Sequence, residues 1–144
     1  MTERDFLSDV QSAWDYRREH WGPHFTDELQ KKVRHIKKVQ KAGITTYDAA
    51  YAVLGDAWAN VKLRHSVAVA LELIAHMGRW KRPRRQWIDR RKIAPAVLIA
   101  LQSKDKHLQW EVSELAGELR LKRAVPLLIQ LAPTSGFAER ALSM

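Results

Sequence analysis

Residues 108–132 read LQWEVSELAGELRLKRAVPLLIQLA, and the spacing of their apolar side chains predicts two successive helices. In residues 108–119 the apolar positions fall at i, i+4, i+7, i+8 and i+11, which places them on one face of an α-helix. A second apolar run at 124–129 has Pro126 near its start, where a helix tolerates proline. A similar run contains Pro95, 31 residues earlier. A repeat period between about 20 and 50 residues is typical of a solenoid.

The same stretch resembles a HEAT-like repeat of the short bacterial type named after phycocyanobilin lyases. The matching positions are Leu108, Trp110, Glu111, Glu114, Gly117, Glu118, Leu119 and residues 123–126. In such repeats a glycine lets two helices approach closely, as Gly117 would here, and an Ala-Val-Pro turn opens the next repeat. Arg120 and Leu121 replace the Gly-Asp that usually tightens the turn between repeats, so a longer or helical turn is expected there.

The resemblance covers residues 61–144 and implies an all-α fold, a short HEAT-like α-solenoid of antiparallel helix pairs. Residues 63–77 match the second helix of a preceding repeat, residues 79–92 form an insertion, and residues 137–142 begin a truncated last repeat. Residues 1–60 match the repeat poorly. We expect them to form an N-terminal helical cap over the open end of the solenoid, within one structural unit.

The rest of the chain is also expected to be helical, because Gly and Pro are few and no stretch alternates as a strand does. The predicted helices cover residues 2–21, 26–43, 46–58 and 61–77. Gly43 and Gly78 are the residues expected to end two of them. The last of these helices is apolar almost all round, which indicates that neighbours cover it on several sides. Trp58, Tyr47 and Tyr51 are expected in the core.

Composition excludes several classes of protein. The chain has 144 residues and no Cys, so a disulfide framework, a thiolate metal site and a cysteine nucleophile are excluded. The first residues lack the basic and apolar regions of a secretory signal. The longest near-apolar run, residues 93–101, is far shorter than the roughly 20 residues of a membrane span. We therefore expect a soluble, cytoplasmic protein without a membrane partner.

The net charge of +9 is concentrated in one segment, residues 79–92, which read RWKRPRRQWIDRRK and carry eight positive residues and one negative. Arg offers a planar fork to phosphate, and Trp offers a face on which a base stacks. The candidate nucleic-acid-binding residues are Arg79, Trp80, Lys81, Arg82, Arg84, Arg85, Trp87, Arg90, Arg91 and Lys92. The alternative interpretation is a solvated charged loop whose Trp side chains pack back on the core.

A secondary basic stripe lies earlier in the chain. The stripe consists of Lys31, Arg34, Lys38 and Lys41, spaced three or four residues apart on one predicted helix. Exposed helix faces are often rich in Lys, so the stripe becomes a stronger candidate binding surface only if it lies on the same side as residues 79–92.

Acidic residues could neutralise part of residues 79–92 within the chain. Asp89 is expected to pair with Arg85 or Lys92. An acidic stripe would weaken the case for an anionic partner if it neutralised residues 79–92. It consists of Glu111, Glu114 and Glu118.

No motif predicts catalysis, a cofactor or a metal site. The sequence contains no GxSxG, Walker or GxGxxG motif. Its six histidines follow no metal-ligand spacing: His20, His24, His35, His65, His76 and His107. Asp15 and Glu19 form a carboxylate pair one helical turn apart, which we interpret as a surface pair offset by Arg17 and Arg18. The expectation is a protein that is not an enzyme and has neither cofactor nor metal.

Three functions remain open at this point. The first is a non-enzymatic helical-repeat module that contacts DNA or RNA phosphates through residues 79–92, with strong salt dependence. The second is a protein–protein adaptor, or a subunit of a larger assembly, that binds an acidic protein. The third, implied by the resemblance alone, is a HEAT-like DNA glycosylase, although that family's active-site motif does not map onto this chain. The apolar end at residues 138–144 also predicts a partner there or a homo-oligomer.

Overall fold

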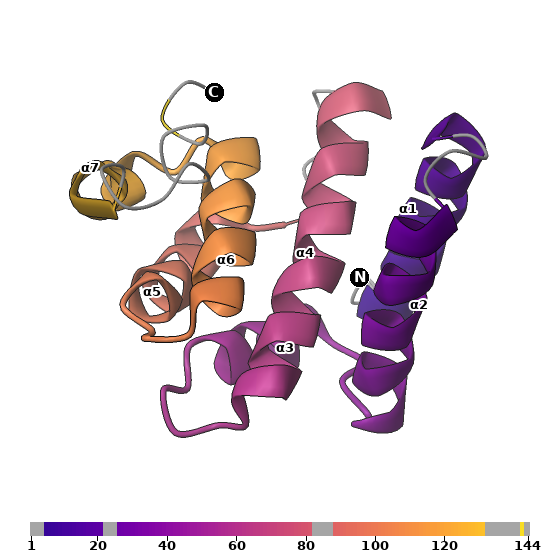
Figure 1. Ribbon diagram of the computed structural model, residues 1–144, viewed down its shortest axis with the longest axis horizontal. Helices are drawn as coiled ribbons and strands as arrows, with labels where there is room; N and C mark the ends of the chain where they lie inside the picture. Colours follow the sequence, from indigo (N-terminus) through magenta and orange to yellow (C-terminus); the bar gives the residue numbers. More distant parts are fainter. Residues whose placement is uncertain (1–4, 22–25, 82–87, 132–141, 143–144) are drawn as a thin grey trace.

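The computed structural model describes residues 5–21, 26–81, 88–131 and 142. Its regular elements are α1 (Phe6–Trp21), α2 (Thr26–Lys41), α3 (Tyr47–Leu54), α4 (Val61–Lys81), α5 (Arg90–Leu101), α6 (Lys106–Leu119), the 3-10 turn η2 (Lys122–Ala124) and α7 (Val125–Leu131), drawn in Figure 1. The described ranges contain no strand, so the predicted all-α class is confirmed. No described helix combines the length and the apolar composition that crossing a membrane requires.

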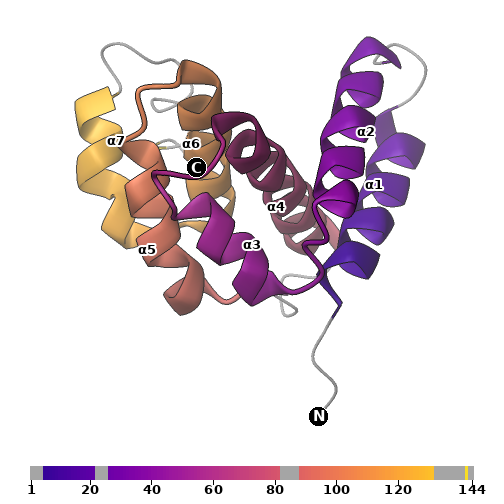
Figure 2. The ribbon, with the colours of Figure 1, turned by 90° about the horizontal axis from the view of Figure 1, so that it is seen from below.

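Helix α4 lies in the middle of the fold, packed against α1, α2, α3 and α6 (Figures 1 and 2). Residues 67–75 are buried on every side, as their apolar composition predicts. The prediction that Gly78 ends this helix is wrong, because α4 continues through Gly78 to Lys81. A helical glycine costs only about 1 kcal/mol relative to Ala, so it ends a helix only where the chain also turns. Gly43, with φ 73°, makes such a turn after α2.

Two rows of helices make up the C-terminal part of the described chain. Helix α3 packs against α5, and α5 packs against η2, whereas α4 packs against α6 (Figure 2). The α3–α5 contact is close at Gly55, where an added Cβ would lie 3.1 Å from the Cα of Ala96. Arg120, in the left-handed conformation with φ 52°, ends α6, and the following turn is the 3-10 turn η2. Arg120 and Leu121 themselves are left-handed and extended, so the helical part of the turn begins only at Lys122.

Helices α1 and α2 cover α4 on the side opposite α6 (Figure 1). The Phe6 and Tyr47 rings meet edge to face, and the Tyr47 hydroxyl donates a hydrogen bond to Asp9. Tyr51 is buried and Tyr47 is partly buried, as expected. Trp58 is 96% exposed, so its expected place in the core is wrong. Helix α3 ends at Leu54, and Trp58 lies in the turn beyond it, with its backbone N–H bound to Asp56.

Side-chain caps begin five of the described helices, among them α1, capped by Asp5, and α4, capped by Asn60. Thr46 caps α3, Asp105 caps α6, and Asp89 caps α5 by accepting hydrogen bonds from the backbone N–H groups of Arg91 and Lys92. The predicted ion pair between Asp89 and Lys92 is wrong, since the Asp89 carboxylate caps the helix and the Lys92 Nζ lies 3.8 Å from Asp48 instead. The other predicted partner, Arg85, lies outside the described residues.

Candidate functional site

Helix α2 carries the basic surface that the structure describes most fully. Residues 31–41 include six Lys and Arg and no acidic residue. We define the α2 basic face as its five exposed cations: Lys31, Arg34, Lys37, Lys38 and Lys41. At 100° per residue these positions span an arc of about 120° around the helix. The opposite side of α2 is anchored by Ile36 and Val39, which are buried.

Four cations of the α2 basic face form no ion pair with any acidic side chain that the structure describes. These four are Arg34, Lys37, Lys38 and Lys41. Like charges this close repel one another, which raises the local affinity for anions. The predicted secondary stripe is therefore an exposed positive surface, and Lys37 belongs to it although the sequence analysis did not include it.

In the segment at 79–92, the structure describes the helical backbone of residues 79–81, which end α4, and residues 88–92. Arg90, Arg91 and Lys92 are exposed in the first turn of α5. The remaining candidate residues lie outside the described residues or have side chains that are not described: Arg79, Trp80, Lys81, Arg82, Arg84, Arg85 and Trp87. Cations are unfavourable at the N-terminus of a helix, because that end of the helix carries a partial positive charge. An anion bound at this turn would therefore relieve the repulsion between the helix end and these three side chains.

The two described basic regions lie on helices that are not neighbours. Helices α3 and α4 lie between α2 and α5 in both views (Figures 1 and 2). The helix that carries the α2 stripe is therefore separated from the helix that begins with Arg90, Arg91 and Lys92.

A polar groove runs over α4 between α2 and α6. At its centre is an open pocket of about 150 Å³. The lining residues are Lys31, Lys32 and His35 from α2, His65 and Val69 from α4, and His107, Trp110, Glu111 and Glu114 from α6. One wall is basic and the other is acidic, so this groove suits a ligand that carries both charges.

Three histidines from three helices meet in the groove. The His35 and His65 ring centroids lie 4.6 Å apart, and those of His65 and His107 lie 6.0 Å apart. The Nε2 of His65 is 3.9 Å from the Oε1 of Glu111. Burial alone would raise the pKa of Glu111, but the His65 imidazole and the charge of Lys32 outweigh it and hold the pKa below its usual value. Glu111, a member of the acidic stripe, thus faces His65 on α4.

The tautomer of His35 follows from its neighbour. The Ser66 hydroxyl donates its single proton to the Lys62 carbonyl at 3.0 Å. Its oxygen can therefore only accept from the Nδ1 of His35, which lies 2.9 Å away. Neutral His35 consequently carries its proton on Nδ1, and its Nε2 is left as an acceptor.

Stability should fall in mild acid because of His35. Burial and the neighbouring His65 lower the pKa of His35 from 6.5 to about 4. Between these two pH values the unfolded chain binds the proton and the folded chain does not, so the free energy of unfolding decreases as the pH falls from about 6.5 to about 4. Urea unfolding at several pH values should show a shallower decrease for His35→Gln than for the native protein. His107→Gln, at an exposed position, should leave the decrease unchanged, and equal slopes for all three proteins would contradict this origin.

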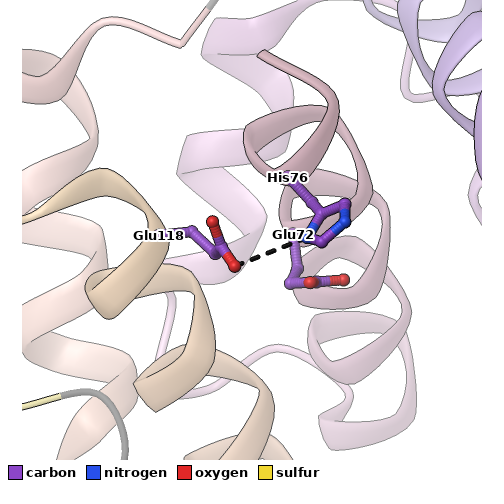
Figure 3. A group of neighbouring side chains, drawn as sticks. All are labelled: Glu72, His76 and Glu118. Atoms are coloured by element: carbon purple, nitrogen blue, oxygen red, sulfur yellow. Dashed lines mark hydrogen bonds and ion pairs between the residues drawn. The ribbon is translucent and has the colours of Figure 1, made fainter. Parts of the chain in front are cut away.

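A second polar group lies further along the same face of α4. The Nη1 of Arg17, on α1, is 2.8 Å from the Oε2 of Glu72, and both residues are buried. The expectation that Arg17 offsets the Asp15 and Glu19 pair is wrong, although Arg18 does approach Asp15, at 3.5 Å on the surface. Beside Glu72, the Nδ1 of His76 lies 3.4 Å from the Oε1 of Glu118 (Figure 3).

Comparison with protein-family models, with curated proteins and with solved structures gave no match. Function must therefore be proposed from charge and side-chain geometry.

The groove is lined by one stripe of residues on α4 and one on α6, and only the α6 stripe is evident from the sequence. Positions 65, 69, 72 and 76 of α4 and positions 107, 111, 114 and 118 of α6 both follow i, i+4, i+7, i+11. The α6 acidic stripe was recognised, but the His and Glu side chains of α4 are spread through an apolar helix. Polar residues recurring on one face of such a helix are the signal that would have found the groove.

Proposed function

We propose that this protein is a non-enzymatic helical-repeat module that binds the phosphates of DNA or RNA. The observation that carries the proposal is the α2 basic face, five exposed cations on one arc of one helix. Arg90, Arg91 and Lys92, with the rest of residues 79–92, form a second proposed contact. Because the contacts are to phosphate, binding is tolerant of sequence.

The proposed architecture is a short HEAT-like solenoid in which α3 with α4 and α5 with α6 are the antiparallel pairs. The packing of α3 on α5 and of α4 on α6 supports this arrangement. Helices α1 and α2 then form the cap over the open end. In this arrangement the α2 basic face lies on the cap, at one edge of the groove.

The physical basis of binding is neutralisation and counterion release. Each phosphate that meets a Lys or Arg releases condensed counterions, so the logarithm of the affinity falls with the logarithm of salt by about 0.9 per phosphate on B-DNA. Three cations of the α2 basic face that each meet one phosphate therefore contribute about 2.7 to the slope. The ligand also relieves the repulsion among these side chains.

The test is fluorescence anisotropy of labelled duplex and single-stranded oligonucleotides at several salt concentrations. The variant Arg34→Gln, Lys38→Gln, Lys41→Gln is expected to bind at least about tenfold more weakly at low salt, with a slope smaller by about 2.7 on duplex DNA. The matched control removes the same charge from exposed positions elsewhere, as Lys104→Gln, Lys106→Gln, Lys122→Gln. It should bind within about threefold of the native protein.

Two outcomes would contradict the proposed function. Equal weakening of both triple variants would mean that only net charge matters, and absence of binding by the folded native protein at low salt would exclude a nucleic-acid module. The separate variant Arg90→Gln, Arg91→Gln, Lys92→Gln tests the second contact. If it weakens binding while the α2 variant does not, residues 79–92 carry the interaction.

A protein–protein adaptor is the second candidate, favoured by an exposed apolar surface. Trp58 is 96% exposed, and the nearby Val61 and Ile99 are also exposed. Val61, Ile99 and Ala57 line an open pocket of about 360 Å³. Exposed Trp side chains are enriched where proteins meet. Tighter binding of an acidic polypeptide than of an oligonucleotide of equal charge, lost in Trp58→Ser, would favour this function.

A further inference from the structure

Glu72, His76 and Glu118 converge between α4 and α6 from positions that no sequence motif joins (Figure 3). Glu72 and His76 are one helical turn apart on α4, so both project from the same face. Glu118 reaches the same point from α6. One ligand atom from each residue can be chosen so that all three lie within 4.8 Å of one another.

The spacing of these atoms suits a metal ion. In a tetrahedral zinc site with ligand distances of about 2.0–2.2 Å, two ligand atoms lie about 3.4 Å apart. The Nδ1 of His76 and the Oε1 of Glu118 are 3.4 Å apart. The third ligand atom, from Glu72, lies within 4.8 Å of both. Imidazole nitrogen with carboxylate oxygen is a donor set typical of zinc and the neighbouring divalent ions.

Arg17 orients Glu72 in the way that ligating carboxylates are usually oriented. Its Nη1 binds the Oε2 of Glu72 at 2.8 Å, which leaves the Oε1 of Glu72 for another partner. Outer hydrogen bonds of this kind hold metal ligands in place. The site is also shielded, because Glu72 is 2% exposed and the Glu118 side chain is 8% exposed. His76 is more open, which gives an ion a path from solvent.

We propose that Glu72, His76 and Glu118 bind one divalent transition-metal ion, with Zn²⁺ as the best fit, and that water completes the coordination. The carboxylates of Glu72 and Glu118 offset the charge of the ion, which leaves one positive charge when Arg17 is included. The ion takes the place of the proton that would otherwise lie between His76 and Glu118. Since the ligands come from α4 and α6, the ion links the two helices and stabilises their packing.

The test is calorimetric titration of Zn²⁺ into chelator-treated, full-length protein, together with thermal unfolding with and without the ion. The native protein is expected to bind one ion per chain and to unfold at a higher temperature in its presence. Glu118→Gln and His76→Gln should each bind at least about tenfold more weakly. Glu114→Gln and His107→Gln, which change neighbouring groove residues of the same kinds, should bind as the native protein does.

Each outcome decides the proposal. Native binding with unchanged affinity in Glu118→Gln and His76→Gln would overturn it, as would a folded native protein that binds no Zn²⁺. Loss of binding in His107→Gln alone would place the ion at the groove histidines instead. Circular dichroism of each variant without metal establishes that weak binding does not result from unfolding.

Discussion

Replacement of Arg17 by Met is expected to lower the free energy of unfolding by about 3–5 kcal/mol, because it leaves a buried charge without its partner. Glu72 is 2% exposed, and the Arg17 guanidinium approaches it at 2.8 Å. A carboxylate taken out of water loses its hydration, and the paired cation is what compensates for that loss. The free energy of unfolding of native and variant proteins, measured in urea without metal, checks this value.

Two further variants separate the buried charge from general effects of the substitution. The double variant Arg17→Met, Glu72→Met should recover most of the loss, since apolar replacement of a whole buried pair is often neutral or stabilising. Arg18→Met breaks the exposed pair with Asp15 and should cost less than about 1 kcal/mol. A loss in Arg17→Met no larger than that in Arg18→Met would contradict the prediction.

Truncation of Leu71 to Ala in the middle of α4 should cost about 2–5 kcal/mol. Leu71 is fully buried, in the helix that α1, α2, α3 and α6 surround. The cost combines the lost transfer free energy of the side chain with a cavity that neighbours on several sides cannot fill. Denaturant unfolding of the variant gives the value directly, as a lower midpoint at an unchanged slope.

The matched control for Leu71 is Val61→Ala at the start of the same helix. Val61 is 39% exposed, so its truncation should change the free energy of unfolding by about 0.5 kcal/mol or less. Similar losses for the two variants would mean that α4 is not the packed centre of the fold.

The helices were predictable because the signals for them are local. The apolar period of residues 108–119, the run at 67–75 and the turn at Gly43 each lie within a short continuous stretch of sequence. Trp58 was placed wrongly because an aromatic residue just past the end of a helix has the same local pattern whether it turns inward or outward.

The polar sites were not predictable, because they are made by residues far apart in the chain. Arg17 and Glu72 are 55 residues apart, and His76 and Glu118 are 42 apart. Each of these residues has an ordinary surface interpretation on its own helix, and only the packing of α1 and α6 on α4 brings them together. The α2 stripe, in contrast, was predictable, since its residues share one face of one helix.

The central position of α4 has a consequence for how the chain can be divided. Its apolar surface is covered from one side by helices that precede it in the chain and from the other by α6, which follows it. A fragment that begins at residue 61 would keep α4 but leave one flank of it open to water, and a fragment that ends at residue 81 would open the other flank. Neither half retains a closed core, so we expect residues 61–144 and the N-terminal helices to unfold together in one cooperative transition.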